Sequence, residues 1–272
     1  PGRAGAVWEA MARGHKEGSQ GRHLVSYHGD WSSSSSEWYH GADWLDFNTV
    51  QSGHTFDSDS GYFVSLDHAL SPAKPTVDIE PSYENHPAGE GSPRIDSHKV
   101  RTQAYSAMLS GAAGHGYGAL DLFWFFKEGD GPFPRGGGGW SEPAFQPWRT
   151  ALAYEGSAQM GLMRGLFEQR PWHRLIPRQS LIASYKGDGV HRRTAALASD
   201  GAFILAYLPE GGSITIRGLD GLAGPALTAS RSTTASPTGS GMLTASWFDP
   251  RTGHWKEIGR YPKTADRSFT AP

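Results

Sequence analysis

The seven residues PTVDIEP, at positions 75–81, form a short apolar, β-branched run that ends in a carboxylate. Val77 and Ile79 alternate with polar residues, a pattern that favours a strand. Pro81 cannot continue a hydrogen-bonded ladder, so it sets Glu80 at the strand end. A carboxylate held there, with little freedom to swing, can approach a carbon atom from one defined side.

Similar strand-like segments lie on both sides of this run. Helical patterns separate them, around residues 62–70 and most clearly at 97–110. An alternation of strand, polar loop and helix is typical of βαβ units with a parallel sheet. The sequence therefore predicts an α/β domain in which four strands lie side by side and parallel, in the order 23–28, 47–54, 75–80 and 119–126.

Each predicted strand ends in residues that can bind or transform a substrate. In parallel α/β folds the carboxyl ends of the strands are where functional sites are assembled. We therefore expect Glu80 to be catalytic. The candidate substrate-binding residues at or just after the strand ends are Tyr27, His28, Gln51, His54, Tyr83, Glu84 and Trp124. The residues alone leave Glu84 open, as a second carboxylate of the site or as an ordinary loop residue.

Composition narrows the function classes. The chain has 272 residues, and its net charge of −2 argues against a nucleic-acid or anionic-membrane surface, since both partners require a basic face. No apolar run is long enough to suggest a membrane span, and no signal peptide opens the chain. The absence of cysteine excludes thiol catalysis and thiolate metal sites but leaves the compartment open, secretion and the periplasm included.

Metal-binding patterns are also absent from the sequence. The twelve histidines form neither an HxH pattern nor a helical zinc pair with glutamate. No phosphate-binding glycine loop and no nucleophile-elbow serine occurs. We expect a site with no metal and no organic cofactor.

The pattern of the sequence changes near residue 172. Beyond it, short alternating runs are separated by Gly, Pro and Asp turns, which is typical of an antiparallel β-sandwich. We therefore predict two domains, residues 1–172 and residues 173–272. The predicted runs in the second are 179–183, 193–197, 202–208, 213–216 and 245–248.

Several of these motifs together resemble the apiosidase-like glycoside hydrolases, the relatives of glycoside hydrolase family 140. The resemblance rests on HLVSYH at 23–28, SSSEWYH at 34–40, WLDFN at 44–48, QSGH at 51–54 and the segment from Lys74 to Glu84. The second domain is similar to the C-terminal collagen-binding domain of many such proteins. Its matching runs are 172–181, AYLPEG at 206–211 and WFDPRTG at 247–253.

The resemblance implies a fold, a reaction and a substrate class. It implies the C-terminal half, strands five to eight, of a (β/α)8 barrel, followed by a small β-sandwich. It also implies a retaining glycosidase that acts on plant cell-wall glycan side chains such as apiose-bearing pectin. Glu80 would be its nucleophile, with Trp124, His28 and His54 lining the subsite. The acid/base carboxyl would belong to an N-terminal half barrel that this chain lacks.

Two rival readings come from other functional classes. In the first, the chain is a non-catalytic carbohydrate- or matrix-binding protein whose β domain does the binding. In the second, it is a truncated product with no activity of its own. The expected partners are a carbohydrate substrate and a missing half barrel, with no nucleic acid and no membrane.

Overall fold

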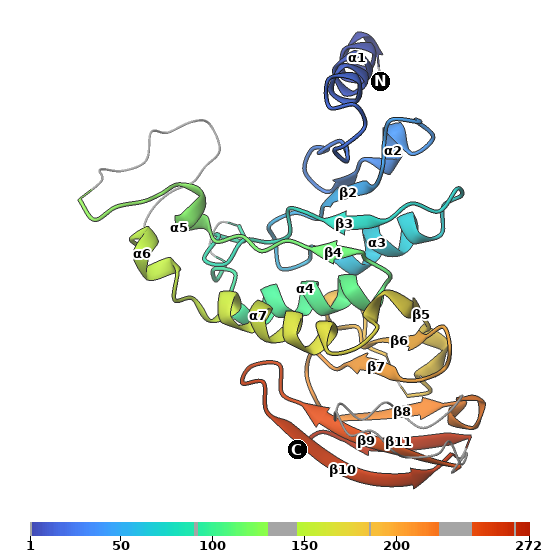
Figure 1. Cartoon of the computed structure of the whole chain (residues 1–272). Helices are drawn as coiled ribbons and strands as arrows, with labels where there is room; N and C mark the ends of the chain where they lie inside the picture. Colours follow the sequence, from blue (N-terminus) through green and yellow to red (C-terminus); the bar gives the residue numbers. More distant parts are fainter. Residues whose placement is uncertain (1, 90–91, 130–145, 185, 223–240, 264) are drawn as a thin grey trace.

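The computed structural model describes residues 2–89, 92–129, 146–184, 186–222, 241–263 and 265–272 (Figure 1). An α/β part comes first, and strands that pair only antiparallel follow it. The helices are α1 Gly2–Gly18, α2 Ser36–Tyr39, α3 Ser60–His68, α4 Ser97–Leu109, α5 Leu120–Phe123, α6 Trp148–Ala151 and α7 Glu155–Glu168. The strands are β1 Ser33–Ser34, β2 Asn48–Gln51, β3 Thr76–Asp78, β4 Gly114–His115, β5 Leu175–Pro177, β6 Thr194–Ala198, β7 Ile204–Tyr207, β8 Ser213–Arg217, β9 Met242–Phe248, β10 Trp255–Pro262 and β11 Asp266–Thr270.

The first sheet has the strand order β1-β2-β3-β4. Strands β2, β3 and β4 are parallel, with Asn48 opposite Thr76 and Val77 opposite Gly114. The predicted strands at 47–54 and 75–80 are therefore present, parallel and adjacent. In contrast, β1 pairs antiparallel with β2.

The predicted strand at 23–28 is wrong. These residues form no ladder, although they lie beside the chain that enters β2. Asp46 N donates to Val25 O over 2.9 Å, and the Thr49 hydroxyl donates to Tyr27 O. One isolated backbone hydrogen bond and one side-chain hydrogen bond thus take the place of a ladder, and among the described residues it is β1 that pairs with this edge of β2.

The predicted strand at 119–126 is also wrong. The third parallel strand is β4, five residues earlier, and the apolar run forms the short helix α5 instead. Only a single parallel bridge, between Glu84 and Ala119, continues the ladder toward it. The consequence is that Trp124 lies at the C-cap of α5 rather than at a strand end.

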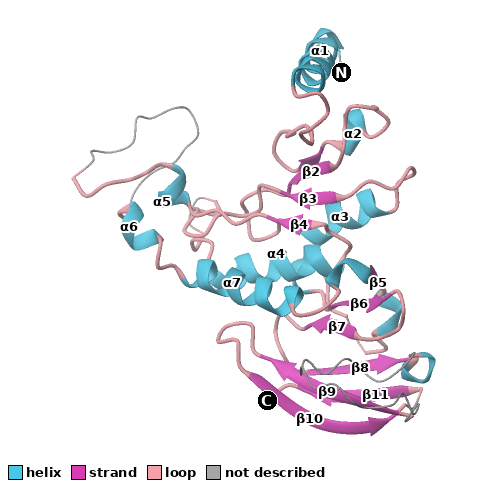
Figure 2. Cartoon of the chain, viewed as in Figure 1, coloured by secondary structure: helices cyan, strands magenta, loops and turns pink. Residues whose placement is uncertain are grey.

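Helices α3 and α4 begin at aspartate caps. The Asp59 side chain accepts from Tyr62 N over 3.1 Å, and the Asp96 side chain accepts from Lys99 N over 2.8 Å. Helix α4 lies between the parallel sheet and the antiparallel strands, and α7 packs beside it (Figure 2). Ten of the thirteen residues of α4 are buried because this helix is covered on both sides.

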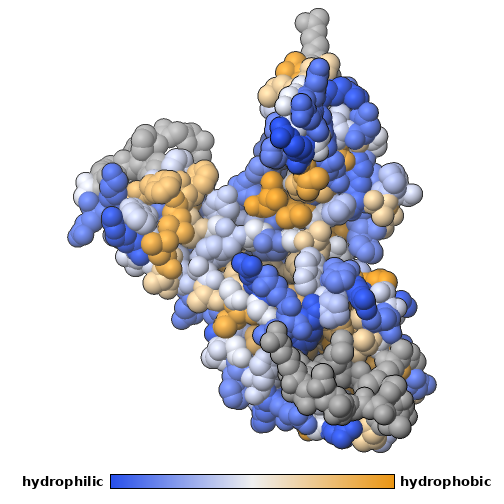
Figure 3. Space-filling model, viewed as in Figure 1, coloured by the Kyte–Doolittle hydropathy of each residue, from blue (hydrophilic) through white to orange (hydrophobic). Residues whose placement is uncertain are grey.

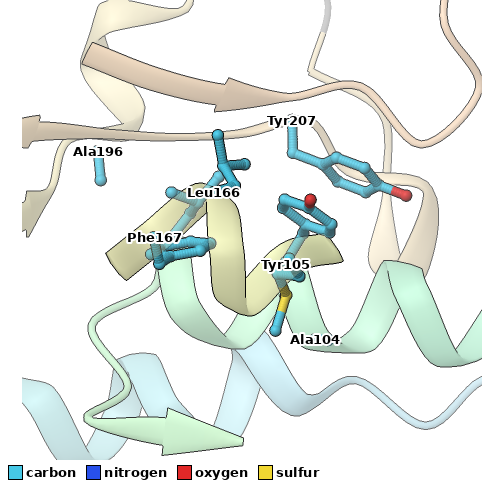
Figure 4. Packing of buried hydrophobic residues seen from close by; sticks show 8 residues of the cluster. Ala104, Tyr105, Leu166, Phe167, Ala196 and Tyr207 are labelled. Carbon is cyan, nitrogen blue, oxygen red and sulfur yellow. The ribbon is translucent and has the colours of Figure 1, made fainter. Parts of the chain in front are cut away.

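One hydrophobic cluster joins the two parts of the chain (Figure 4). Tyr105 of α4 stacks on Tyr207 of β7, with ring centroids 4.5 Å apart and planes 9° apart. Leu166 and Phe167 of α7 and Ala196 of β6 belong to the same cluster. Because the cluster spans the predicted boundary at residue 172, the strands beyond it share a core with the α/β part.

The antiparallel strands form three small sheets, β5-β6-β7, β11-β8 and β10-β9. Leu181, Ile182, Ala195, Ile214 and Ile216 bury their side chains in a second cluster. Trp247 and Phe269 pack against that cluster from β9 and β11. The sandwich description of this part stays a prediction.

Candidate active site

Glu80 is the second residue after β3, and its backbone is still hydrogen-bonded to the neighbouring strand. Val50 O of β2 accepts from Ile79 N over 3.0 Å and from Glu80 N over 3.4 Å. The carboxylate therefore leaves the sheet from a fixed backbone, at the carboxyl end of a parallel strand.

Two histidines contact the two oxygens of this carboxylate. His28 Nε2 lies 2.9 Å from Glu80 Oε2, and His54 Nε2 lies 3.2 Å from Oε1. Glu80 is 19% exposed, His28 is exposed and His54 is buried. Oε2 is thus contacted by an exposed histidine and Oε1 by a buried one.

Tyr83 is a further partner of Glu80. Its hydroxyl is hydrogen-bonded to the carboxylate, and burial, together with the charge of Glu80, raises the pKa of Tyr83 to about 12. Burial also lowers the pKa of His54, against the attraction of Glu80. At neutral pH Tyr83 is therefore protonated and His54 neutral, and each can donate one hydrogen to the carboxylate.

His54 lies between three other rings. It stacks on His86 at 4.6 Å, tilts against Tyr83 at 4.5 Å and meets the edge of Trp31 at 5.4 Å. Burial and the neighbouring His54 lower the pKa of His86 to about 4. Trp31 and His86 were not among the predicted site residues, although Trp31 is a lone aromatic in a polar loop, a signal that could have marked it.

A buried hydrogen-bond network supports the loop that follows Glu80. The Ser82 hydroxyl donates to Gly53 O over 2.9 Å, and Ser82 N donates to Gln103 Oε1 of α4 over 3.1 Å. A side chain at Gly118 would place its first carbon 2.1 Å from the Tyr83 ring. Glycine at position 118 thus leaves room for the tyrosine that donates to Glu80.

Glu84 makes contacts of a different kind. Its carboxylate accepts from the Tyr117 hydroxyl over 2.8 Å and from Gly156 N, in the first turn of α7, over 3.1 Å. Burial raises the pKa of Glu84 in spite of both donors. Its oxygens therefore face a tyrosine and a helix N-terminus rather than Glu80.

The other predicted site residues lie further from the carboxylate. Tyr27 is in an aromatic group, with Tyr39 at 4.9 Å and Trp8 at 5.6 Å. Gln51 ends β2 with a half-buried side chain. Trp124 packs on Phe123 at 5.0 Å, and Phe123 in turn lies 5.8 Å from Tyr83. The structure thus joins His28, His54 and Tyr83 directly to Glu80, while Trp124 packs on Phe123, which contacts Tyr83.

In the described ranges of the chain, no three His, Asp or Glu side chains are grouped so as to hold a metal ion. Within those ranges, no helix combines the length and the apolar character needed to cross a membrane.

Comparison with known proteins gives two family-model matches. The model described as "Apiosidase-like, catalytic domain" matches residues 2–174. The model described as "Putative collagen-binding domain of a collagenase" matches residues 230–272. No match was found among curated proteins.

Solved structures of glycoside hydrolases share this fold. A structure titled "Glycoside hydrolase" is 26% identical, with a TM-score of 0.81, over 97% of this chain and 57% of its own. A family 5 glycoside hydrolase from Bacteroides vulgatus ATCC 8482 is also 26% identical, with a TM-score of 0.80, over 97% of this chain and 56% of its own. The chain thus spans little more than half the length of these relatives.

Proposed function

The chain belongs to the apiosidase-like family, and from this premise we propose that it carries the nucleophile of a retaining glycoside hydrolase. The observation that carries the proposal is the carboxylate of Glu80, which stands at a parallel strand end with His28, His54 and Tyr83 around it. We further propose that the substrates are plant cell-wall glycan side chains, such as apiose-bearing pectin. The family match and the glycoside hydrolase neighbours support that class.

The chemistry begins with attack by Glu80. One carboxylate oxygen forms a bond to the anomeric carbon while the bond from that carbon to the leaving oxygen breaks. Hydrogen bonds from His54 and Tyr83, together with the contact to His28 Nε2, hold the carboxylate in one orientation. Water then attacks the glycosyl-enzyme intermediate and releases Glu80.

The leaving oxygen needs a proton from a second carboxyl group. In retaining enzymes the two carboxyl groups lie roughly 5–5.5 Å apart. Glu84, the nearest glutamate along the described chain, already accepts from Tyr117 and Gly156. Asp78 is the last residue of β3 and fully buried, opposite His115 of β4. As the resemblance to the family implies, we propose that the acid/base is a carboxyl group outside this chain, supplied by the other half of a (β/α)8 barrel.

Covalent trapping tests the nucleophile directly. A 2-deoxy-2-fluoro glycoside with a dinitrophenolate leaving group needs no acid to depart, so the chain alone should form a stable adduct. We expect mass spectrometry of a digest to place that adduct on Glu80. Glu80→Gln should form none, while Glu84→Gln, the matched control four residues away, should still be labelled. An adduct on another residue, or labelling that persists in Glu80→Gln, would refute the assignment.

The match at residues 230–272 favours a second, binding function for the antiparallel strands. Its test is co-sedimentation of the whole chain with fibrillar collagen and, in parallel, with insoluble pectin. Binding to collagen alone would favour a matrix-binding role. Binding to pectin alone would favour a carbohydrate-binding role that supports the hydrolase.

A further inference from the structure

Four rings form a continuous row past the carboxylate. In order they are Trp31, His54, Tyr83 and Phe123, with successive centroid distances of 5.4, 4.5 and 5.8 Å. Glu80 is attached to the middle of the row, because His54 and Tyr83 are the two rings that donate to it.

Exposure rises toward both ends of the row. His54 is buried and Tyr83 half-buried, whereas Trp31 is 49% exposed and Phe123 is 59% exposed. Beyond Phe123, Trp124 and Phe125 are exposed as well. Figure 3 shows hydrophobic residues on the surface of the projecting part that carries α5 and α6. The row thus has an inner pair of rings that orient Glu80 and open aromatic faces at its two ends.

The loop around Trp31 presents the indole in one place. The Asp30 carboxylate accepts from Trp31 N over 2.7 Å, and Ser32 adopts a left-handed φ of 55°. The indole rests against Gly53, where an added side-chain carbon would lie 3.5 Å from the ring and 3.0 Å from the Ser58 hydroxyl. Gly53 itself has a φ of 97°, so larger residues are disfavoured there. The exposed ring is thus held by a constrained loop rather than left free to turn.

We infer that Trp31 and Phe123 are stacking platforms for sugars next to the one that Glu80 attacks, so that the site takes an oligosaccharide rather than a single sugar. The C–H face of a sugar ring is apolar, and it packs well on an open aromatic face. A sugar bonded at Glu80 has one platform at each end of the ring row. The inference rests on the proposed function, since it assigns neighbouring subsites to that same site.

Calorimetric titration of the full chain tests this inference. Turnover is blocked by Glu80→Gln, and the ligands are size-fractionated oligosaccharides of one to six sugars from pectin side chains. We expect affinity to rise with length. Trp31→Ala and Phe123→Ala should each weaken binding of the longest fractions about tenfold, the equivalent of about 1.4 kcal/mol, and leave single sugars unaffected. The matched control is Tyr62→Ala on α3, which removes an equally exposed ring outside the row and should change nothing.

Three outcomes would overturn the inference: affinity independent of length, unchanged binding in both platform variants, or no binding at any length. Circular dichroism on each variant separates lost stacking from misfolding. Labelling of Glu80 by the small fluoro-glycoside is measured separately, because it needs no sugar on either platform. Length-dependent binding without labelling of Glu80 would refute the nucleophile assignment and leave the platforms in place. Labelling of Glu80 without length-dependent binding would refute the platforms and leave the nucleophile assignment in place.

Discussion

At the scale of single residues, the site is defined by how many donors surround Glu80. One carboxylate accepts from His54 and Tyr83 and contacts His28 Nε2 at 2.9 Å, and hydrogen bonds to a charged acceptor are about twice as strong as neutral ones. Burial keeps Tyr83 protonated and His54 neutral, so neither donor depends on a charge of its own. The arrangement fixes the direction of the carboxylate and leaves it mostly shielded from water.

The stacked pair of His54 and His86 predicts how stability depends on pH. The pKa of His86 is about 4 in the folded chain, against about 6.5 when unfolded. Between these values the unfolded state binds more protons, so stability falls as pH falls through this window. From pH 7 to pH 5 the loss from His86 should be about 2 kcal/mol.

Urea unfolding of the wild type and of His86→Phe at both pH values measures this effect. The phenylalanine keeps a ring against His54 but cannot be protonated, so the variant should lose about 2 kcal/mol less than the wild type over the same interval. His68→Phe on α3 is the control for replacing an ordinary histidine. Equal losses in the wild type and His86→Phe would show that His86 is not held in its neutral form.

At the scale of elements, Glu84 ties together three segments. It connects its own loop with Tyr117 after β4 and with the first turn of α7. The loop that contains Glu80 and Tyr83 is therefore fixed against a helix. A side chain at position 156 would collide with the Glu84 carboxylate, so only glycine fits there. A carboxylate at a helix N-terminus also interacts favourably with the helix dipole.

We predict that Glu84→Ala lowers the free energy of unfolding by about 2–4 kcal/mol, because two donors lose a buried acceptor. Glu84→Gln should cost less, since an amide oxygen can still accept one of them. Chemical denaturation measures both changes. At a temperature where Glu84→Gln is folded, it should be labelled at Glu80 like the wild type. Loss of labelling in a folded Glu84→Gln would place this residue in the chemistry instead.

The sequence predicted those elements that have strong local signals. Strands β2 and β3, helix α4 and strands β6 to β8 lie where alternation or helical spacing placed them. The turn of WFDPRTG also forms the hairpin between β9 and β10, where Asp249 N donates to His254 O over 2.9 Å. Strand β4 was missed because Gly114 and His115 carry no β-branched or aromatic signal. The aromatic run at 119–126 carries that signal, but it forms the helix α5 and an exposed surface.

The candidate site was predicted more fully than the strand order. Glu80, His28, His54 and Tyr83 were all among the expected residues, and the structure brings them into contact. A strand end can be recognised from local sequence, and Pro81 marks this one. Trp31 and Phe123 could not be placed, since their contacts with His54 and Tyr83 depend on how distant loops meet.

At the scale of the whole molecule, the parallel sheet is covered unequally. Thr76 and Asp78 of β3 are buried on the side of the helices, and the Thr76 hydroxyl contacts Asp67 of α3. Side chains alternate along a strand, so Val77 points to the opposite face, where it is half-buried. Ile79, the first residue after β3, is 38% exposed. Parallel strands are normally covered on both faces, and this partly open face is an observation in favour of our proposal that the sheet is part of a larger barrel.

The last prediction tests our proposal that the acid/base lies outside this chain. The 272-residue chain should turn over 2,4-dinitrophenyl glycosides, whose leaving group departs as an anion, but not natural glycosides. Without a general acid the natural substrate loses the roughly 10²–10⁴-fold acceleration that such catalysis provides. Turnover of both substrate types is compared, with Glu80→Gln as the control that should abolish the residual activity. Rapid turnover of a natural glycoside by a monodisperse monomer would mean that the acid is within this chain, and the half-barrel assignment would fall.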